Sequence, residues 1–123
     1  MKEVLGLVSF LLLDAVYLKL ISNYFGKQVK NIQGSDMNVN KIAAAVVYTL
    51  IGVQWYFMIF KKINKEKMKS VLFKAFLLGL TTYGIFDFTN MAIFKNYTLK
   101  TALIDSVWGG TLYFLVTLLQ YKM

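Results

Sequence analysis

The stretch of residues 42–60 reads IAAAVVYTLIGVQWYFMIF and carries no charged residue from end to end. A helix needs about 20 mainly apolar residues to cross the hydrocarbon part of a bilayer. Backbone polar groups find no water inside lipid, so they must bond within the segment, which an α-helix achieves. The stretch therefore predicts a membrane-spanning helix.

Three further segments are similarly apolar, each interrupted by one aspartate and one lysine. A soluble four-helix bundle would show a charged face on every helix, yet residues 106–120 carry no charge on any face. We therefore predict an all-α polytopic membrane protein whose four transmembrane helices form an antiparallel bundle, with a single domain over residues 1–123. The predicted helices cover about residues 4–25, 42–60, 71–94 and 99–121.

The composition of the 123-residue chain agrees with a lipid environment: 58% of residues are hydrophobic and 16% are charged. Soluble domains carry about 25% charged and 45–50% apolar residues. All 14 basic residues are lysine, and the chain has no Cys or His. Disulfides, thiol chemistry and histidine general bases are thereby excluded. Because arginine is the preferred reader of phosphates and bases, its absence argues against a nucleic-acid partner. No cofactor is expected.

The lysines predict an orientation, because cytoplasmic loops are enriched in basic residues. One connection is densely basic, and both termini fall on its side, with Lys2 and Lys122. We therefore expect an integral, multi-pass membrane protein whose two termini are cytoplasmic. Besides the bilayer itself, the expected partners are anionic lipids at the basic connection. Its lysines are Lys61, Lys62, Lys65, Lys67 and Lys69.

The connections differ in length and polarity. Residues 26–41 form the longest and most polar predicted connection, whereas residues 95–98 are few enough for a tight turn, so that the last two helices form a hairpin. Asn40, Ser70 and Thr98 are residue types that cap helix N-termini, and we predict that each begins a helix.

Half of the six acidic residues fall inside predicted helices: Asp14, Asp87 and Asp105. A charged side chain at the centre of a spanning helix costs about 2.5–3.5 kcal/mol. Asp87 and Asp105 lie on either side of the tight turn, and a rise of 1.5 Å per residue puts both roughly 10 Å from the same membrane face. The three carboxylates are therefore predicted to gather in the half of the membrane away from the basic connection.

Each of the three aspartates is followed three residues later by a hydrogen-bonding side chain: Tyr17, Asn90 or Trp108. Residues three or four apart share a helix face, so each aspartate belongs to a polar stripe along its helix. Glycines on the last two helices would let their backbones approach closely; these are Gly79, Gly84, Gly109 and Gly110. The predicted intramembrane polar site comprises Asp14, Tyr17, Tyr83, Asp87, Asn90, Asp105 and Trp108.

Three interpretations of this site stay open. The side chains can be hydrogen-bonding contacts that only hold helices together. Close, desolvated carboxylates can instead share a proton, a role that aspartate has in transporters. A hard cation such as Mg²⁺ also prefers carboxylate oxygens, although an Asp-x-x-Asn spacing alone does not establish a metal site. No catalytic residue or metal ligand is assigned.

The same residues carry a family resemblance. The run YGIFDFTNMA at residues 83–92, followed by DSVWG at residues 105–109 and preceded by LDAVYL at residues 13–18, resembles a bacterial family of small predicted membrane proteins described as a domain of unknown function. Phe86 and Thr98 depart from the family pattern, where Tyr and Pro are common. The resemblance implies four membrane helices and a shared polar motif, without naming an activity.

The leading functional hypothesis is a small transport component that moves protons, cations or small molecules through the aspartate cluster. Four helices are few for a pathway, so this hypothesis expects a homo-oligomer. One alternative is a membrane-embedded lipid-modifying enzyme or its accessory subunit, although the multi-aspartate signatures of membrane phosphotransferases are absent, which argues against an enzyme. Another is a structural or partner-binding membrane subunit.

Overall fold

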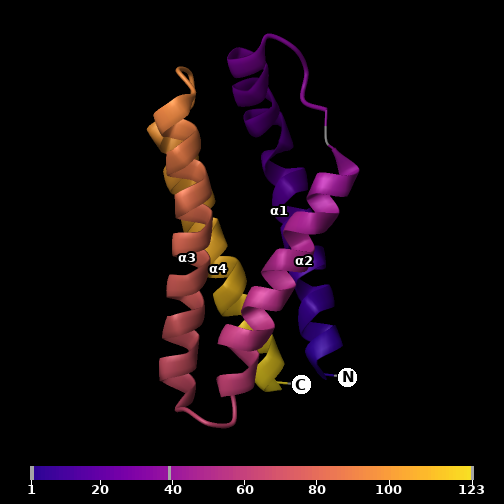
Figure 1. The fold of residues 1–123 in the computed structure, drawn as a ribbon, viewed down its shortest axis with the longest axis vertical. Coiled ribbons are helices and arrows are strands. Elements are labelled where there is room, and N and C mark those ends of the chain that lie inside the picture. Colours follow the sequence, from indigo (N-terminus) through magenta and orange to yellow (C-terminus); the bar gives the residue numbers. More distant parts are fainter. Residues whose placement is uncertain (1, 39, 123) are drawn as a thin grey trace.

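The computed structural model describes residues 2–38 and 40–122, and four long α-helices run along its longest axis (Figure 1). Successive helices alternate in direction and pack together, which confirms the predicted all-α bundle. All four are long and apolar enough to cross a membrane. The helices are α1 (Lys2–Gln33), α2 (Lys41–Met58), α3 (Met68–Ile93) and α4 (Leu99–Lys122), and a short 3₁₀ helix η1 (Phe60–Lys62) follows α2.

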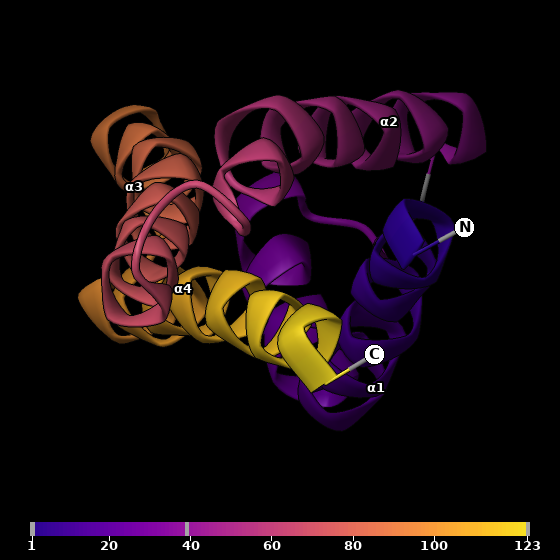
Figure 2. The ribbon, with the colours of Figure 1, turned by 90° about the horizontal axis from the view of Figure 1, so that it is seen from below.

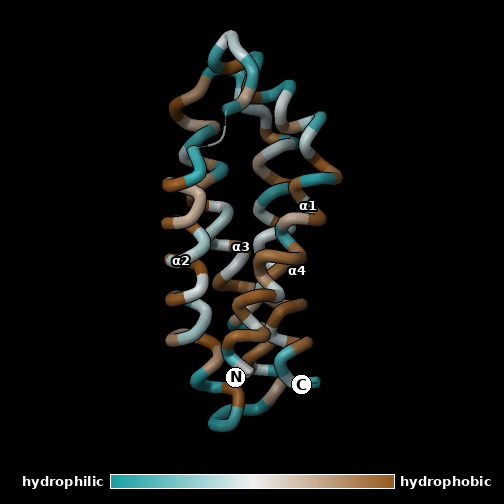
Figure 3. The backbone as a smooth tube through the Cα atoms, turned by 90° about the vertical axis from the view of Figure 1, so that its right-hand side faces the viewer, coloured by the Kyte–Doolittle hydropathy of each residue, from teal (hydrophilic) through white to brown (hydrophobic). Residues whose placement is uncertain are grey.

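The two ends of the bundle differ. The first turn of α1, the last turn of α4 and the connection between α2 and α3 lie together at one end, which we call the basic end (Figure 1). The turn between α3 and α4 lies at the opposite end, the hairpin end. Figure 3 shows hydrophilic residues at both ends of the bundle, whereas hydrophobic residues recur along the helices between the ends.

Helix α1 is longer than the sequence predicts, since it continues through Gly26 to Gln33. A single glycine inside a helix costs only about 1 kcal/mol, and the position is open, with nothing within 4 Å of a β-carbon there. The helix ends instead at Gly34, whose φ of 77° is readily adopted by glycine, and whose N–H donates to the carbonyl of Lys30 at 2.8 Å. The predicted connection of residues 26–41 is thus half helix.

Two of the three predicted N-caps are confirmed. Asn40 accepts a hydrogen bond from the N–H of Ala43 at 3.0 Å, and Thr98 accepts one from the N–H of Thr101 at 3.2 Å. The prediction for Ser70 is wrong, because α3 begins at Met68.

Glu66 explains the earlier start of α3. Its carboxylate precedes the helix, where the positive end of the helix dipole favours an anion. The Ser70 hydroxyl donates to Glu66 Oε1 at 3.4 Å, so Ser70 lies one turn inside the helix. Lys74 Nζ lies 2.5 Å from the same oxygen, and this hydrogen bond holds the pKa of Glu66 below its ordinary value. The ion pair is therefore formed at neutral pH and weakens only as the pH falls through that lowered pKa.

Helices α3 and α4 form the closest pair, because two glycines meet at their crossing. A β-carbon added to Gly79 would lie 2.1 Å from the carbonyl oxygen of Gly109, and one added to Gly110 would lie 2.8 Å from the ring of Phe76. Gly84 is different, since the nearest atom to its added β-carbon is 3.6 Å away. Gly79 and Gly109 are therefore close backbone approaches, Gly110 packs closely against a side chain, and the contact at Gly84 is ordinary packing.

A cluster of aromatic side chains, the aromatic core, fills the bundle toward the basic end. Trp55 of α2 and Tyr113 of α4 are fully buried, and Phe10 of α1 packs edge-on against both rings at 5.6 and 5.0 Å between centroids. The indole N–H of Trp55 donates to the hydroxyl of Thr117 at 3.0 Å, so its polar atom is satisfied. Seen along the bundle, α1, α3 and α4 pack as a group and α2 lies across them (Figure 2).

Candidate functional site

The three intramembrane aspartates lie between the aromatic core and the hairpin end, in what we call the polar layer. Asp14 of α1 is 5% exposed. Its Oδ1 accepts a hydrogen bond from the indole N–H of Trp108 at 2.9 Å, and its Oδ2 accepts one from the hydroxyl of Tyr48 on α2. One carboxyl group thereby joins three helices.

Asp105 of α4 mirrors this arrangement. Its Oδ1 accepts a hydrogen bond from the hydroxyl of Tyr17 on α1 at 3.0 Å. The rings of Tyr17 and Trp108 are stacked, with centroids 4.6 Å apart and planes within 5°. Each of the two helices thus presents an aspartate and, three residues later, an aromatic donor that bonds to the aspartate of the other helix. We call this reciprocal pair of contacts the α1–α4 clasp.

Asp87 of α3 is the most enclosed of the three, with no exposed surface. Its Oδ1 accepts a hydrogen bond from the hydroxyl of Tyr97 at 2.5 Å. Its Oδ2 is buried and has no hydrogen-bond partner among residues 2–38 and 40–122. The side chain of Asp105 is a direct neighbour of this carboxyl group, across the α3–α4 interface.

Asp87 and Asp105 can lower their mutual repulsion by sharing one proton. Two carboxylates in contact repel each other, and a desolvated ion is costly. One proton placed between them removes one charge and gives a hydroxyl that can donate to the other carboxyl group. Such a proton would also satisfy the unpaired Oδ2 of Asp87, which the protein itself leaves without a donor.

The sequence places Tyr17, Asn90 and Trp108 on the same helix face as the aspartate three residues earlier, and the structure shows which groups they contact. Tyr17 and Trp108 serve the aspartates of the opposite helices, because antiparallel helices that cross at this level bring each donor over its neighbour. Asn90 interacts with the hydroxyl of Tyr97. Tyr83 packs its ring against Gly109, so that its side chain fills the space which that glycine leaves.

Two donors of the polar layer were not found from the sequence. Tyr48 lies in the uncharged α2, where nothing in the local pattern separates it from the other aromatic residues. Tyr97 looks like an aromatic residue of the membrane interface, but it is only 6% exposed and turns inward from the α3–α4 turn. The one sequence feature that points to Tyr97 is its position in the turn after α3, ten residues from Asp87.

The three aspartates do not form a cluster of metal ligands. Within the described part of the chain, no group of three acidic side chains is close enough to hold an ion. Instead, Asp14 is linked to the other two through Tyr17 and Trp108, whose stacked rings lie between the two carboxyl groups of the clasp. The arrangement suits the binding of protons better than that of a hard cation.

These features define the class of the protein: a four-helix integral membrane protein with a polar layer of tyrosine-bound aspartates. The chain belongs to the family described as Predicted membrane protein (DUF2177), whose model matches residues 3–122. No curated protein matches the chain, and no solved structure does. The family identity confirms the predicted resemblance, and membership supplies a membrane location without an activity.

Proposed function

We propose that the protein is a component of a membrane transport system and that the Asp87–Asp105 pair is its proton-exchange site. The single observation that carries this proposal is the buried, unpaired Oδ2 of Asp87 beside a second carboxyl group. A protein that used these residues only as fixed contacts would gain from pairing every buried polar atom. An unpaired oxygen instead suits a group that gains and loses a proton.

Access to the pair is one-sided in this proposal. Tyr97 bonds to Asp87 and also lines a cavity at the hairpin end, so this side chain contacts both the pair and that cavity. Toward the basic end, the aromatic core of Phe10, Trp55 and Tyr113 closes the bundle. In this proposal Tyr97 must move to open the pair toward the cavity while the aromatic core stays closed, as alternating access requires.

The assembly and orientation follow from the same reasoning. Four helices with their interior filled by side chains leave little room for a complete pathway, so the transporting unit is a homo-oligomer. The basic end faces the cytoplasm, since its connection carries the denser group of lysines, and these lysines contact anionic lipids there. Both chain termini are then cytoplasmic.

A structural subunit is the second candidate, and one observation favours it. Every one of the three aspartates accepts a hydrogen bond from a tyrosine hydroxyl, so each is already a contact between elements. In that case the aspartates stabilise the bundle, and proton movement is unrelated to them. The lipid-modifying enzyme has no comparable support, because no acidic metal cluster forms within the described residues.

Proton flux into liposomes separates the two candidates. The full chain is reconstituted with a pH-sensitive dye inside, and a potassium gradient with valinomycin drives protons inward. We expect the wild type to exceed protein-free liposomes, and Asp87→Asn to lower the protein-dependent rate at least about tenfold, because an amide cannot take up the proton and positioned proton-transfer groups contribute factors of this size or more.

The matched control is Asp36→Asn, the same change at an exposed carboxylate near the end of α1. It is expected to leave the flux unchanged. Equal rates for wild type and Asp87→Asn, or no flux above protein-free liposomes, would contradict the proton-exchange proposal and leave the structural subunit.

A further inference from the structure

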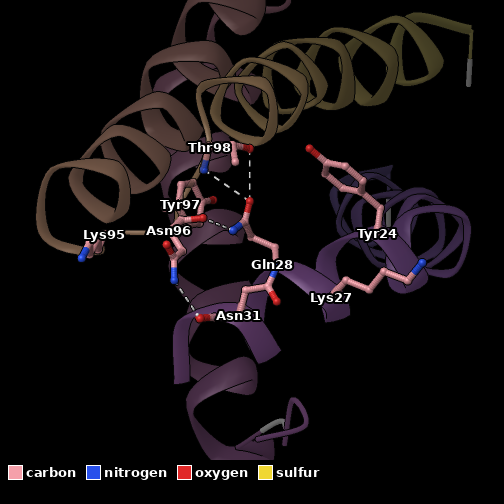
Figure 4. Close-up of a pocket in the computed structure, with 8 residues that line it drawn as sticks. All are labelled: Tyr24, Lys27, Gln28, Asn31, Lys95, Asn96, Tyr97 and Thr98. Carbon is pink, nitrogen blue, oxygen red and sulfur yellow. Dashed lines mark hydrogen bonds between the residues drawn. The ribbon is translucent and has the colours of Figure 1, made fainter. Parts of the chain in front are cut away.

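A polar cavity of about 670 Å³ opens at the hairpin end, between the last turns of α1 and the α3–α4 turn (Figure 4). Pockets for small ligands commonly measure about 300–1,000 Å³, so the cavity has the size of a binding site. Its existence depends on residues 26–33 being helical, because these turns form one wall. The lining residues are Tyr24, Lys27, Gln28, Asn31, Lys95, Asn96, Tyr97 and Thr98.

The cavity is positively charged. Lys27 and Lys95 lie at opposite sides of it, with their ammonium groups turned outward and away from each other (Figure 4), and no acidic residue is among the described residues that line it. Neither lysine forms an ion pair with any residue that the structure describes. The other lysines near acidic groups, such as Lys30 with Asp36, are partly neutralised in this way. Two free cations on long, flexible stems are therefore available to a ligand.

The remaining hydrogen-bonding groups of the wall are largely committed to one another. Gln28, 6% exposed, donates to the carbonyl of Asn96 and accepts from the N–H and hydroxyl of Thr98 at 3.3 and 3.1 Å. Asn96 in turn donates to the carbonyl of Asn31 at 3.0 Å. These bonds, drawn in Figure 4, fix the end of α1 to the α3–α4 turn, so the cavity is preformed. The hydroxyl of Tyr24 lies 3.0 Å from that of Thr101, which also bonds to Gln28, so Tyr24 belongs to the same network. The groups available to a ligand thus include two ammonium groups and the side-chain amide of Asn31, and the two positive charges favour an anion.

The cavity also lies at the depth of the lipid head groups. At 1.5 Å per residue, the 32 residues of α1 measure about 48 Å, whereas the hydrocarbon core is about 30 Å thick. The polar last turns of α1 therefore extend beyond the hydrocarbon. A basic cavity at this level is within reach of the phosphates of the lipid head groups.

We propose that this cavity binds a phosphate group, held by Lys27 and Lys95, whose flexible side chains can turn toward it, with the side-chain amide of Asn31 as a further donor. The phosphate belongs either to a phospholipid head group or to a small soluble phosphate. The inference goes beyond the proton-exchange proposal and does not rest on it, because the cavity has its own residues and its own binding assay. The two sites share one wall, Tyr97, which lines the cavity and bonds to Asp87.

The test compares two double variants of the full chain that remove equal charge. Lys27→Gln/Lys95→Gln alters the cavity, and Lys65→Gln/Lys67→Gln alters exposed lysines at the basic end. The first arm titrates inorganic phosphate into protein held in phosphatidylcholine nanodiscs and follows it by phosphorus NMR. The second arm measures, by native mass spectrometry, how much phosphatidylglycerol the protein retains in competition with phosphatidylcholine.

We expect the wild type to bind in at least one arm, and the cavity variant to bind at least about tenfold more weakly there, since two cations that contact the anion are lost. The basic-end variant should keep wild-type affinity in the same arm. Binding of inorganic phosphate identifies a soluble ligand, and selective retention of phosphatidylglycerol identifies a lipid head group. Lys27→Arg/Lys95→Arg, which keeps both charges, should retain binding.

Absence of binding in both arms overturns the proposal. So does an equal loss in the two glutamine variants, because that result shows attraction to total charge rather than to the cavity. A loss of affinity in the arginine variant as large as that in the glutamine variant contradicts it as well. Both cavity lysines are exposed, so the variants are expected to fold; the thermal unfolding midpoint checks this.

Discussion

Gly79→Ala is expected to destabilise the protein by about 1–3 kcal/mol, the usual cost of overpacking a closely packed interior. The added β-carbon would lie 2.1 Å from the carbonyl oxygen of Gly109 and 2.7 Å from the ring of Tyr113. A backbone oxygen cannot rotate away as a side chain can, so α3 and α4 must separate. The free energy of unfolding, measured by titrating detergent-solubilised protein with sodium dodecyl sulfate, should fall accordingly.

Gly84→Ala is the matched control, since it makes the same change five residues further along the same helix. The nearest atom to its β-carbon would be the Ser106 hydroxyl oxygen at 3.6 Å, an ordinary contact. Its stability should stay within about 0.5 kcal/mol of the wild type, as for substitutions away from special features. Equal losses at Gly79 and Gly84 would show that α3 and α4 do not cross at Gly79 and Gly109.

Asp14→Ala should have a comparably large effect through lost hydrogen bonds. Its carboxyl group satisfies the indole N–H of Trp108 and the hydroxyl of Tyr48, and removal leaves these two partly buried donors unpaired. Each unsatisfied buried group costs about 1–3 kcal/mol in proteins, and interhelical hydrogen bonds in one membrane protein average about 0.6 kcal/mol. We expect a loss of about 2 kcal/mol in the free energy of unfolding.

Two further variants show whether the loss of stability comes from the hydrogen bonds of Asp14. Asp36→Ala removes a carboxylate whose partner, Lys30, is also exposed, and exposed ion pairs contribute about 0–1 kcal/mol. Asp14→Asn keeps one carbonyl acceptor and should fall between wild type and Asp14→Ala. If Asp14→Ala were no less stable than Asp36→Ala, the α1–α4 clasp would carry no stabilisation.

The spanning helices were predictable from the sequence because length and apolar content alone define them. The end of α1 was not, since Gly26 and Gly34 look alike as residues and differ in backbone conformation: Gly34 has a positive φ and Gly26 lies in a helix. That error concealed the cavity, whose wall consists of the turns that the sequence assigned to a connection.

The polar layer was predictable only in part. Asp87 and Asp105 are neighbours because a short turn fixes the relative depth of two residues on adjacent helices, which the sequence gives directly. The donors on the aspartates depend on how α1 and α2 rotate and cross α4, which no spacing within one helix encodes. That packing makes Tyr17 and Trp108 bond to the aspartates of each other's helices, and it brings Tyr48 to Asp14.

A proton held between Asp87 and Asp105 gives a signature in infrared difference spectra, because a protonated carboxyl group absorbs apart from a carboxylate. The protein, labelled with carbon-13 at the aspartate carboxyl groups, is reconstituted in lipid at neutral pH and compared with Asp87→Asn and Asp105→Asn. We predict a protonated-carboxyl C=O band in the wild type that shifts with the label and disappears in both variants, since the remaining carboxylate no longer has a partner with which to share the proton. A band that persists unchanged in both variants, or its absence from the wild type, would contradict a proton shared by Asp87 and Asp105.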